Sequence, residues 1–469
     1  MTCNCICYNI NSYNSHLTIV FMNKKKQEGV LDNETTEICM KEYLDESKNA
    51  LIRHSMSRNS VGSIAFEPNA AHAVSPHFSI EIKTLPVTDQ KRSGRCWIFA
   101  GLNILRETIA KKCHIKNFEL SQNYIALYDK IEKANFALES CIKLCSCSPN
   151  DRVFQFILNN PVSDGGQWDM FINLIKKYGV MPKEIFPETF QSSNTMETVF
   201  LVNAAIRSFA SDACRLAKEG KIDEIRPLKD QVMKKIYSMF LNAFGVPVKS
   251  FDFEYTDDKD EYHIDQNLTP KQFCEKYLGD EIYQYQSIIN SPTEDKPFGK
   301  TFTIDFLGNV LEGNNIHHLN LKMDRIKELI IKQLSDGDLV WFGSDVSFYR
   351  LRDYSSWDDN SFDYLSILGF QPEFEKGAML DFRHSAMNHA MVITGVDIKN
   401  GKPTKWKIEN SWGDEVGEKG YYIMSDSWFS KFVYQAVIFK KNLSEDELIE
   451  SKQEPIHLDP WDPMGTLAD

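Results

Sequence analysis

The sequence predicts an α+β protein in which helices dominate the first half of the chain and strands the last third. Helical periodicity marks segments at about 96–112, 121–131, 168–178, 196–219, 222–244 and 321–335. Strand patterns follow at 338–343, 389–396, 404–409, 420–424 and 432–439. The composition, 42% hydrophobic and 25% charged, is typical of a globular protein with an ample core. Helices before strands indicate two lobes with a cleft between them.

Local signals support the limits of several helices. Ser121 is an expected N-cap, and Gly179 ends the helix that opens after the turn Asp164-Gly-Gly-Gln-Trp168. Thr269-Pro270 is typical of an N-cap followed by proline at the first helical position. Residues 1–80 are expected to form a variable arm with one or two short helices, the best candidate lying at 38–52.

Charge and cysteine content exclude several classes of protein. The 53 basic and 66 acidic residues give a net charge of −13, which argues against nucleic acid or an anionic membrane as the main partner. No apolar run approaches the roughly 18 residues of a membrane helix. Eleven cysteines without a repeating framework indicate reduced thiols and a cytoplasmic protein. Cys141, Cys145 and Cys147 cluster, but their spacing is poor for zinc, so no metal or cofactor is expected.

The N-terminus lacks the pattern of a secretory signal. Between Met1 and Met22 no Lys or Arg precedes the apolar patch at 17–21, whereas a secretory signal begins with positive charge. We therefore expect no secretion, and Met22 is an alternative start of translation.

The stretch from Gln90 to Phe99 places a cysteine at the head of an apolar helix. A thiolate at Cys96 would feel the positive end of the helix dipole, which lowers a thiol pKa. The Gln90 amide could act as a second donor to a developing oxyanion. Taken alone, the pattern favours a buried cysteine that opens an ordinary core helix.

Two later segments favour a catalytic cysteine. His389 heads a short apolar run with strand character, and Asn410 ends an alternating segment at an Asn-Ser-Trp-Gly turn. A nucleophilic thiol needs a base that takes its proton and a third group that orients the base. The sequence therefore predicts that Cys96, His389 and Asn410 are catalytic, with Trp412 shielding the imidazole–amide hydrogen bond from water.

Five separated stretches together resemble the papain superfamily of cysteine peptidases, and within it the bleomycin hydrolase and aminopeptidase C family. They are Ser93–Phe99, Asp164–Met170, Val340–Gly343, Glu409–Gly413 and Pro460–Ala468. The resemblance extends from about residue 82 to the C-terminus. It implies a papain-like two-lobed fold, with a helical lobe, an antiparallel β-barrel lobe and a large helical hook insertion.

The resemblance also implies a division of the chain. The expected parts are the arm at 1–80, a helical lobe with the catalytic cysteine at 81–195, the hook at 196–300, a β-rich lobe with His389 and Asn410 at 301–455, and an arm entering the cleft at 456–469. His389 lies 293 residues after Cys96, against about 130–150 in papain-type enzymes, so a large insertion is required. In the family the hook assembles a homohexameric ring, and we expect the same here.

The family places a Gly-Gly turn and the chain end in the substrate cleft. Gly165 and Gly166 are expected to line the non-primed side, where paired glycines allow close backbone approach. At Ala468 and Asp469 the tail is expected to offer a carboxylate to the substrate's α-amino group. Relatives have alanine where this chain has Thr466, and self-trimming would remove Asp469.

The resemblance implies a cysteine aminopeptidase that removes N-terminal residues from peptides through a thioester, with homocysteine thiolactone and bleomycin as further substrates. Two alternatives are kept. One is a papain-like endopeptidase with a mobile tail, and the other is a ring-forming scaffold that binds nucleic acid.

Overall fold

The computed structural model describes residues 29–72, 75–351 and 354–468, in two compact units, Met1–Ile64 and Ala65–Asp469. In the first unit, helices α1 (Asn33–Asp45) and α2 (Ser47–Met56) meet at Glu46. Asp32 caps α1, its Oδ1 accepting a hydrogen bond of 2.9 Å from the backbone N–H of Thr35. The prediction of a single helix at 38–52 is wrong. Glu46, between α1 and α2, adopts an extended conformation (φ −88°, ψ 107°) that interrupts the helix.

Four helices form the part of the second unit that carries Cys96: α5 (Cys96–Cys113), α6 (Gln122–Leu144), α7 (Arg152–Asn159) and α8 (Trp168–Tyr178). The first eleven residues of α5 are all buried, and the helix contacts α6, α8 and strands of the sheet. Ser121 caps α6 as predicted, accepting a bond of 3.0 Å from the N–H of Tyr124. Gly179 ends α8 with a φ of 73°, which favours glycine.

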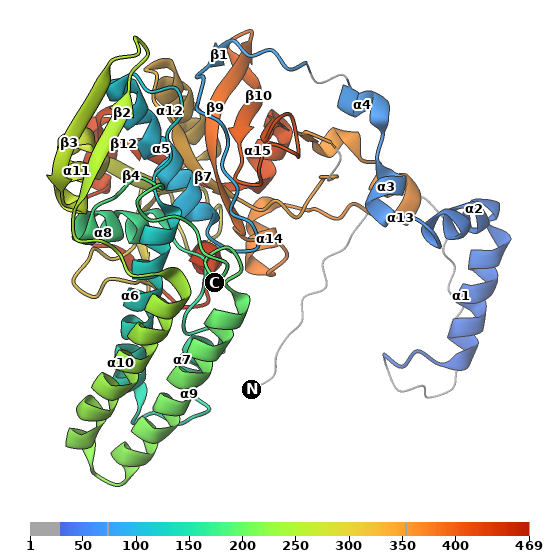
Figure 1. Ribbon diagram of the computed structural model, residues 1–469. Helices are drawn as coiled ribbons and strands as arrows, with labels where there is room; N and C mark the ends of the chain where they lie inside the picture. The colour runs from blue at the N-terminus through green and yellow to red at the C-terminus, as the bar shows by residue number, and fades with distance from the viewer. Residues whose placement is uncertain (1–28, 73–74, 352–353, 469) are drawn as a thin grey trace. The chain divides into compact units, whose positions relative to one another are not determined.

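Two long helices follow, α9 (Met196–Lys218) and α10 (Ile225–Phe244), and they pack side by side (Figure 1). After them comes a hairpin that was not predicted, β2 (Phe251–Thr256) with β3 (Tyr262–Leu268), and then α11 (Pro270–Leu278). Buried and exposed residues alternate along β2, and this alternation is the feature that could have predicted the strand. The buried Phe251 and Phe253 pack on Phe273 of α11. Thr269 forms the predicted N-cap of α11.

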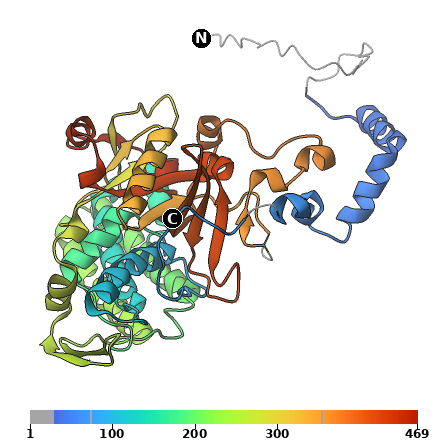
Figure 2. The same cartoon turned by 90° about the horizontal axis from the view of Figure 1, so that it is seen from above.

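The remaining elements build one sheet of eleven strands with helices beside it (Figures 1 and 2). Its strands are β1 (Ile80–Glu81), β4 (Tyr285–Ile289), β5 (Thr301–Ile304), β6 (His318–Asn320), β7 (Val340–Ser344), β8 (Ser356–Trp357), β9 (His389–Lys399), β10 (Lys402–Glu409), β11 (Tyr421–Ser425), β12 (Val433–Phe439) and β13 (Ile456–Leu458). The order is β13-β5-β6-β4-β12-β7-β9-β10-β11-β8, with β1 added to β9. Strands β4-β12-β7-β9-β10-β11 are antiparallel, as expected.

The sheet differs from the expectation in two respects. Three pairs nearer its margins are parallel, β11 with β8, β4 with β6 and β13 with β5. In addition, β4 falls within the range 196–300 expected to form the hook, so the end of that range contributes to the sheet.

Both faces of the sheet are covered, which gives two hydrophobic cores. Residues along β9 alternate between them: Ala390 and Val392 belong to the core that contains α5, while Met391 and Ile393 belong to the core that contains α12 (Met323–Ser335). A strand buried on both faces reads as a continuous apolar run, as this stretch does. None of the helices in the described part of the chain combines the length and apolar character needed to cross a bilayer.

A buried ion pair joins α5 to β10. Arg106 Nη2 lies 3.1 Å from Glu409 Oε1, with both side chains 1% exposed. Asn103 Nδ2 donates to the same carboxylate oxygen at 2.9 Å. Burial raises the pKa of Glu409, and the charge of Arg106 opposes that rise. The pair therefore fixes the helix that begins at Cys96 against the strand that precedes Asn410.

We expect Arg106→Met to destabilise the protein by about 3 kcal/mol, because it leaves a buried carboxylate without its charged partner. The measurement is urea unfolding followed by tryptophan fluorescence. The double variant Arg106→Met/Glu409→Leu should recover most of the loss, since it removes both charges of the buried pair. Arg215→Ala, which breaks an exposed pair with Asp212, is the control and should leave the unfolding midpoint unchanged. A midpoint for Arg106→Met equal to that of the control would contradict this account.

Candidate active site

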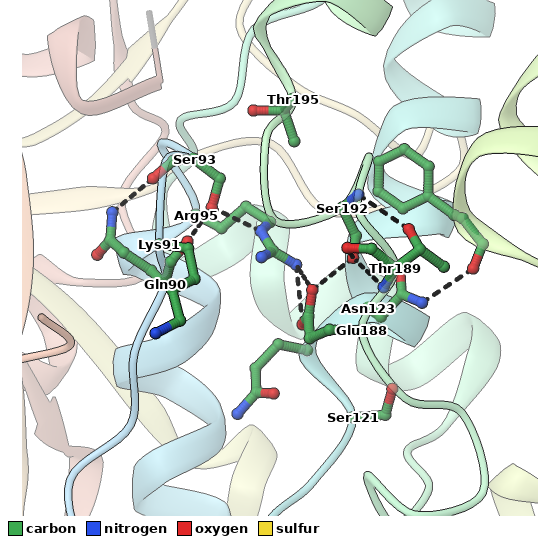
Figure 3. Close-up of polar contacts among 12 residues, drawn as sticks. Gln90, Lys91, Ser93, Arg95, Ser121, Asn123, Glu188, Thr189, Ser192 and Thr195 are labelled. Atoms are coloured by element: carbon green, nitrogen blue, oxygen red, sulfur yellow. Dashed lines mark hydrogen bonds and ion pairs between the residues drawn. The ribbon is translucent and has the colours of Figure 1, made fainter. Parts of the chain in front are cut away.

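The loop before α5 holds Cys96 through a buried arginine. Arg95 precedes the helix, and its Nη1 lies 3.1 and 3.0 Å from the two carboxylate oxygens of Glu188 (Figure 3). Its Nε donates to Ser93 Oγ at 2.8 Å, and Ser93 Oγ donates in turn to the carbonyl of Gln90 at 2.6 Å. These bonds fix the path of the loop, so that Cys96 opens the helix at a defined position.

The thiol of Cys96 is buried and lies at the start of β9. Its Sγ accepts a hydrogen bond of 3.4 Å from the backbone N–H of Ala390, the residue that follows His389. Burial raises the pKa of the thiol to about 11, while the N–H groups of Ala390 and Trp97 oppose the rise. Desolvation therefore outweighs the lowering of this pKa that was expected from the helix terminus.

His389 and Asn410 meet because β9 and β10 are antiparallel neighbours. The first residue of β9 then lies near the end of β10, and His389 Nε2 is 2.8 Å from Asn410 Oδ1. The Trp412 ring stacks on the imidazole with centroids 4.8 Å apart and an angle of 26° between planes. Burial lowers the pKa of His389 to about 4; the bond with Asn410 opposes this and the charge of Arg350 adds to it.

Gln90 is held between the cysteine loop and the Asn-Ser-Trp-Gly turn. Its Nε2 donates to the carbonyl of Ser93 at 2.6 Å, and its Oε1 accepts from Ser411 Oγ at 2.6 Å. The backbone N–H of Gln90 also donates to the carbonyl of Ser411 at 2.9 Å. Sequence reasoning missed this role of Ser411, although the residue lies inside the motif that pointed to Asn410. The second N–H of the Gln90 amide can serve a substrate oxygen.

The tail lies along the Gly-Gly turn. The N–H of Gly166 donates to the carbonyl of Leu467 at 2.9 Å, and Gln167 Nε2 donates to that of Met464 at 3.1 Å. Thr466 Oγ1 donates to the carbonyl of Met387 at 2.8 Å, two residues before His389. A Cβ at Gly166 would come within 2.5 Å of the Trp97 ring, so this position requires glycine.

The tail forms the short 3₁₀ helix η5 (Pro463–Ala468), where no regular helix was expected. The carbonyls of Met464 and Leu467 are satisfied by Gln167 and Gly166, which holds the segment in the site. Asp469 and the side chain of Ala468 lie outside the described residues.

Two buried lysines of α6 contact the Gly-Gly turn from the interior of the protein. Lys133 Nζ lies 3.0 Å from Asp129 Oδ2 and also donates to the carbonyl of Gly165. Lys130 Nζ lies 2.7 Å from Asp164 Oδ1. Burial lowers the pKa of Lys133 to about 8. Sequence reasoning missed both lysines because charged residues on a long amphipathic helix are normally solvated, and only the packing of α6 buries these.

Other residues that could bind a metal ion lie away from Cys96, His389 and Asn410. Among the described residues, Asp257, Glu261 and His263 at the β2–β3 turn form the group whose ligand atoms lie within 4.8 Å of one another. Cys141, Cys145 and Cys147 are free thiols.

Comparison with known proteins places the chain in a family. The sequence model of the peptidase C1-like family matches residues 30–465, beginning well before the motifs near residue 82. The chain is 47% identical to aminopeptidase C of Lactobacillus delbrueckii subsp. lactis over 84% of its own length and 88% of the relative. With aminopeptidase C of Listeria monocytogenes it shares 40% identity over 93% of the chain and 98% of the relative.

A solved structure gives the same result. The crystal structure of PepW from Lactobacillus rhamnosis HN001 matches with a TM-score of 0.91 and 41% identity, over 94% of this chain and 99% of that one. The predicted papain-like α+β fold and the predicted resemblance to aminopeptidase C are thereby confirmed. The enzyme class expected from the sequence, a hydrolase of the cysteine-peptidase type, is also confirmed. The chain belongs to the peptidase C1-like family.

Proposed function

We propose that this protein is a cysteine aminopeptidase that removes N-terminal residues from peptides, with Cys96, His389 and Asn410 as its catalytic residues. The observation that carries the proposal is the tail. An extended substrate would use the N–H of Gly166 on the acyl side of the site, but that group already donates to Leu467. A longer chain is therefore excluded from this side, whereas a single N-terminal residue fits before the tail.

The chemistry follows from the positions of the three groups. His389 takes the proton of Cys96, and the thiolate attacks the scissile carbonyl carbon to form a tetrahedral oxyanion. The backbone N–H of Cys96, at a helix start, and the Gln90 amide stabilise that charge. The imidazolium then protonates the leaving amine, and the C–N bond breaks to leave a thioester. Water, activated by His389, hydrolyses the thioester and restores the thiol.

The turn and the tail supply recognition in this proposal. Gly165 and Gly166 form the wall of the acyl side, and the tail at Ala468 and Asp469 supplies a carboxylate for the substrate's ammonium group. A partly desolvated carboxylate–ammonium pair attracts the free amine and measures length at the same time. Removal of Asp469 by the enzyme itself would leave Ala468 as the anchor.

Assembly into a homohexameric ring in the cytoplasm is also proposed. Large apolar side chains near the ends of α9 and α10 support it: Phe190, Met196, Phe200 and Val246 are 74, 79, 65 and 73% exposed. Exposed groups of this kind are typical of interaction surfaces. The same acyl transfer makes homocysteine thiolactone and the amide of bleomycin proposed substrates, since each offers a carbonyl to a thiolate.

We expect Cys96→Ala to lower kcat/KM for a fluorogenic aminoacyl amide by at least about a thousandfold, because no other group supplies the nucleophile. Cys113→Ala, at the other end of the same helix and equally buried, is the matched control and should retain turnover. Both variants should show the circular dichroism of the wild type. Activity in Cys96→Ala within tenfold of the control would refute the assignment.

The tail predicts a sharp difference between free and blocked substrates. The wild type should hydrolyse a free aminoacyl amide but not its N-acetylated form, and deletion of residues 464–469 should allow both. Thr466→Ala removes the bond to Met387 and should give intermediate turnover of the acetylated compound, whereas Thr466→Ser should match the wild type. Comparable turnover of both substrates by the wild type would instead support an endopeptidase with a mobile tail.

On the acid side of the pH profile, kcat/KM should fall only at a pH below the ordinary pKa of histidine. Burial lowers the pKa of His389 from 6.5 to about 4, so the pair of thiol and imidazole gains its extra proton, and loses activity, only as the pH falls toward about 4. The substrate amine stays protonated throughout this limb. Stopped-flow measurement of kcat/KM between pH 4 and 7, with refolding controls, tests this. Arg350→Gln should move the limb to higher pH, because Arg350 lowers this pKa. A limb at or above pH 6.5 in the wild type would contradict the prediction.

A further inference from the structure

We propose that Arg350 selects substrates whose leaving group carries a carboxylate close to the scissile bond. The inference rests on the proposed function and adds a specificity residue to it. It concerns the side of the site opposite the tail.

The guanidinium of Arg350 is part of the rim beside the imidazole. Its Cζ lies 5.2 Å from the centroid of the Trp412 ring, a cation–π contact. The same ring stacks on His389 at 4.8 Å. Arg350 lies in the loop that follows β7, so the sheet positions it independently of the tail.

The direction of the reaction places the leaving group on this rim. The tail occupies the acyl side, where it is bonded to Gly166 and to Met387. The leaving amine must take its proton from His389, so the departing chain runs from the imidazole past Trp412. The leaving chain then lies beside the cation Arg350, whereas the acyl part of the substrate lies beside the anionic tail.

Arg350 is available for a ligand. It is exposed, and within residues 29–72, 75–351 and 354–468 no carboxylate forms an ion pair with it. Lys91, a second cation near Trp412, is already engaged with Asp89 and lies near Glu415 and Asp414. A planar guanidinium binds a carboxylate through two parallel hydrogen bonds, which suits a mobile peptide end.

The length of a peptide residue makes the contact feasible. An extended residue spans about 3.5 Å, so the C-terminal carboxylate of a leaving amino acid or dipeptide comes within reach of a group one aromatic ring away from the imidazole. An acidic side chain in the first leaving residue offers the same chemistry. Such a preference suits an enzyme whose tail confines the acyl side to one residue, because its substrates are then short or are shortened stepwise.

The test uses matched pairs of peptides and the full-length enzyme under reducing conditions. Leu-Gly-Gly with a free carboxyl is compared with Leu-Gly-Gly-amide, and Leu-Asp-amide with Leu-Asn-amide. A leucine arylamide, which has no carboxylate, reports on catalysis itself. The ratio of kcat/KM within each pair is compared among the wild type, Arg350→Gln, Arg350→Lys and the control Lys91→Gln, so that a general effect of a substitution cancels.

We expect the wild type to favour the carboxylate member of at least one pair by about three- to tenfold, mostly through KM. Arg350→Gln should bring that ratio to about one, Arg350→Lys should retain part of it, and Lys91→Gln should keep the wild-type ratio. If Arg350→Gln changes the ratio in the first pair alone, the terminal carboxylate is the ligand. If it changes the ratio in the second pair alone, the acidic side chain is the ligand.

Two results would overturn the inference. They are wild-type ratios near one in both pairs, and an unchanged ratio in Arg350→Gln. Turnover of the arylamide in either case would leave the proposed function standing. If the wild type fails on the arylamide and on every peptide, both proposals fall together.

Discussion

The packing of one helix against two strands creates the site. Cys96 lies at the start of α5, and its thiol contacts the backbone of Ala390. Further along, Arg106 meets Glu409 at the end of β10. Because Cys96 and His389 are 293 residues apart in sequence, no local structure can bring them together. The burial of apolar side chains between α5 and the sheet supplies the free energy, and the ion pair fixes the register.

The same burial sets the electrostatics. A desolvated thiol holds its proton more firmly, and a desolvated imidazole holds one less firmly, so burial favours the neutral forms of Cys96 and His389. In the proposed mechanism, proton transfer between them creates two opposite charges in a low dielectric, where each stabilises the other. The N–H groups at the helix start and the Gln90 amide would add stabilisation where charge develops.

The two sides of the site are formed by different kinds of residue. On the acyl side Gly166 lies against Trp97 and the tail, and Lys133 supports the turn from the interior. Buried charges are costly unless paired, and this lysine is paired with Asp129 and bonded to carbonyl groups. On the opposite side the exposed guanidinium of Arg350 lies over the Trp412 ring. This difference between the two sides suits the proposed removal of residues from the end of a chain.

Sequence reasoning reached the fold class and the proposed catalytic groups through local patterns. A cysteine at a helix start, a histidine at the head of a buried strand and an Asn-Ser-Trp-Gly turn are short motifs whose chemistry is readable without coordinates. Helix ends at Ser121, Gly179 and Thr269 were likewise predictable, because caps depend on neighbouring residues. The hairpin at 251–268 was missed even though its alternation is local.

What the sequence by itself determined, then, is the identity of the chemical groups and the elements that carry them. Only the tertiary structure decided the environment of those groups. The raised pKa of Cys96, the burial of Lys133 and the bond between Gly166 and the tail all arise from contacts between segments far apart in the chain. The physical reason is that desolvation and long-range hydrogen bonding depend on what packs around a residue. The residues beside it in sequence carry no record of those neighbours.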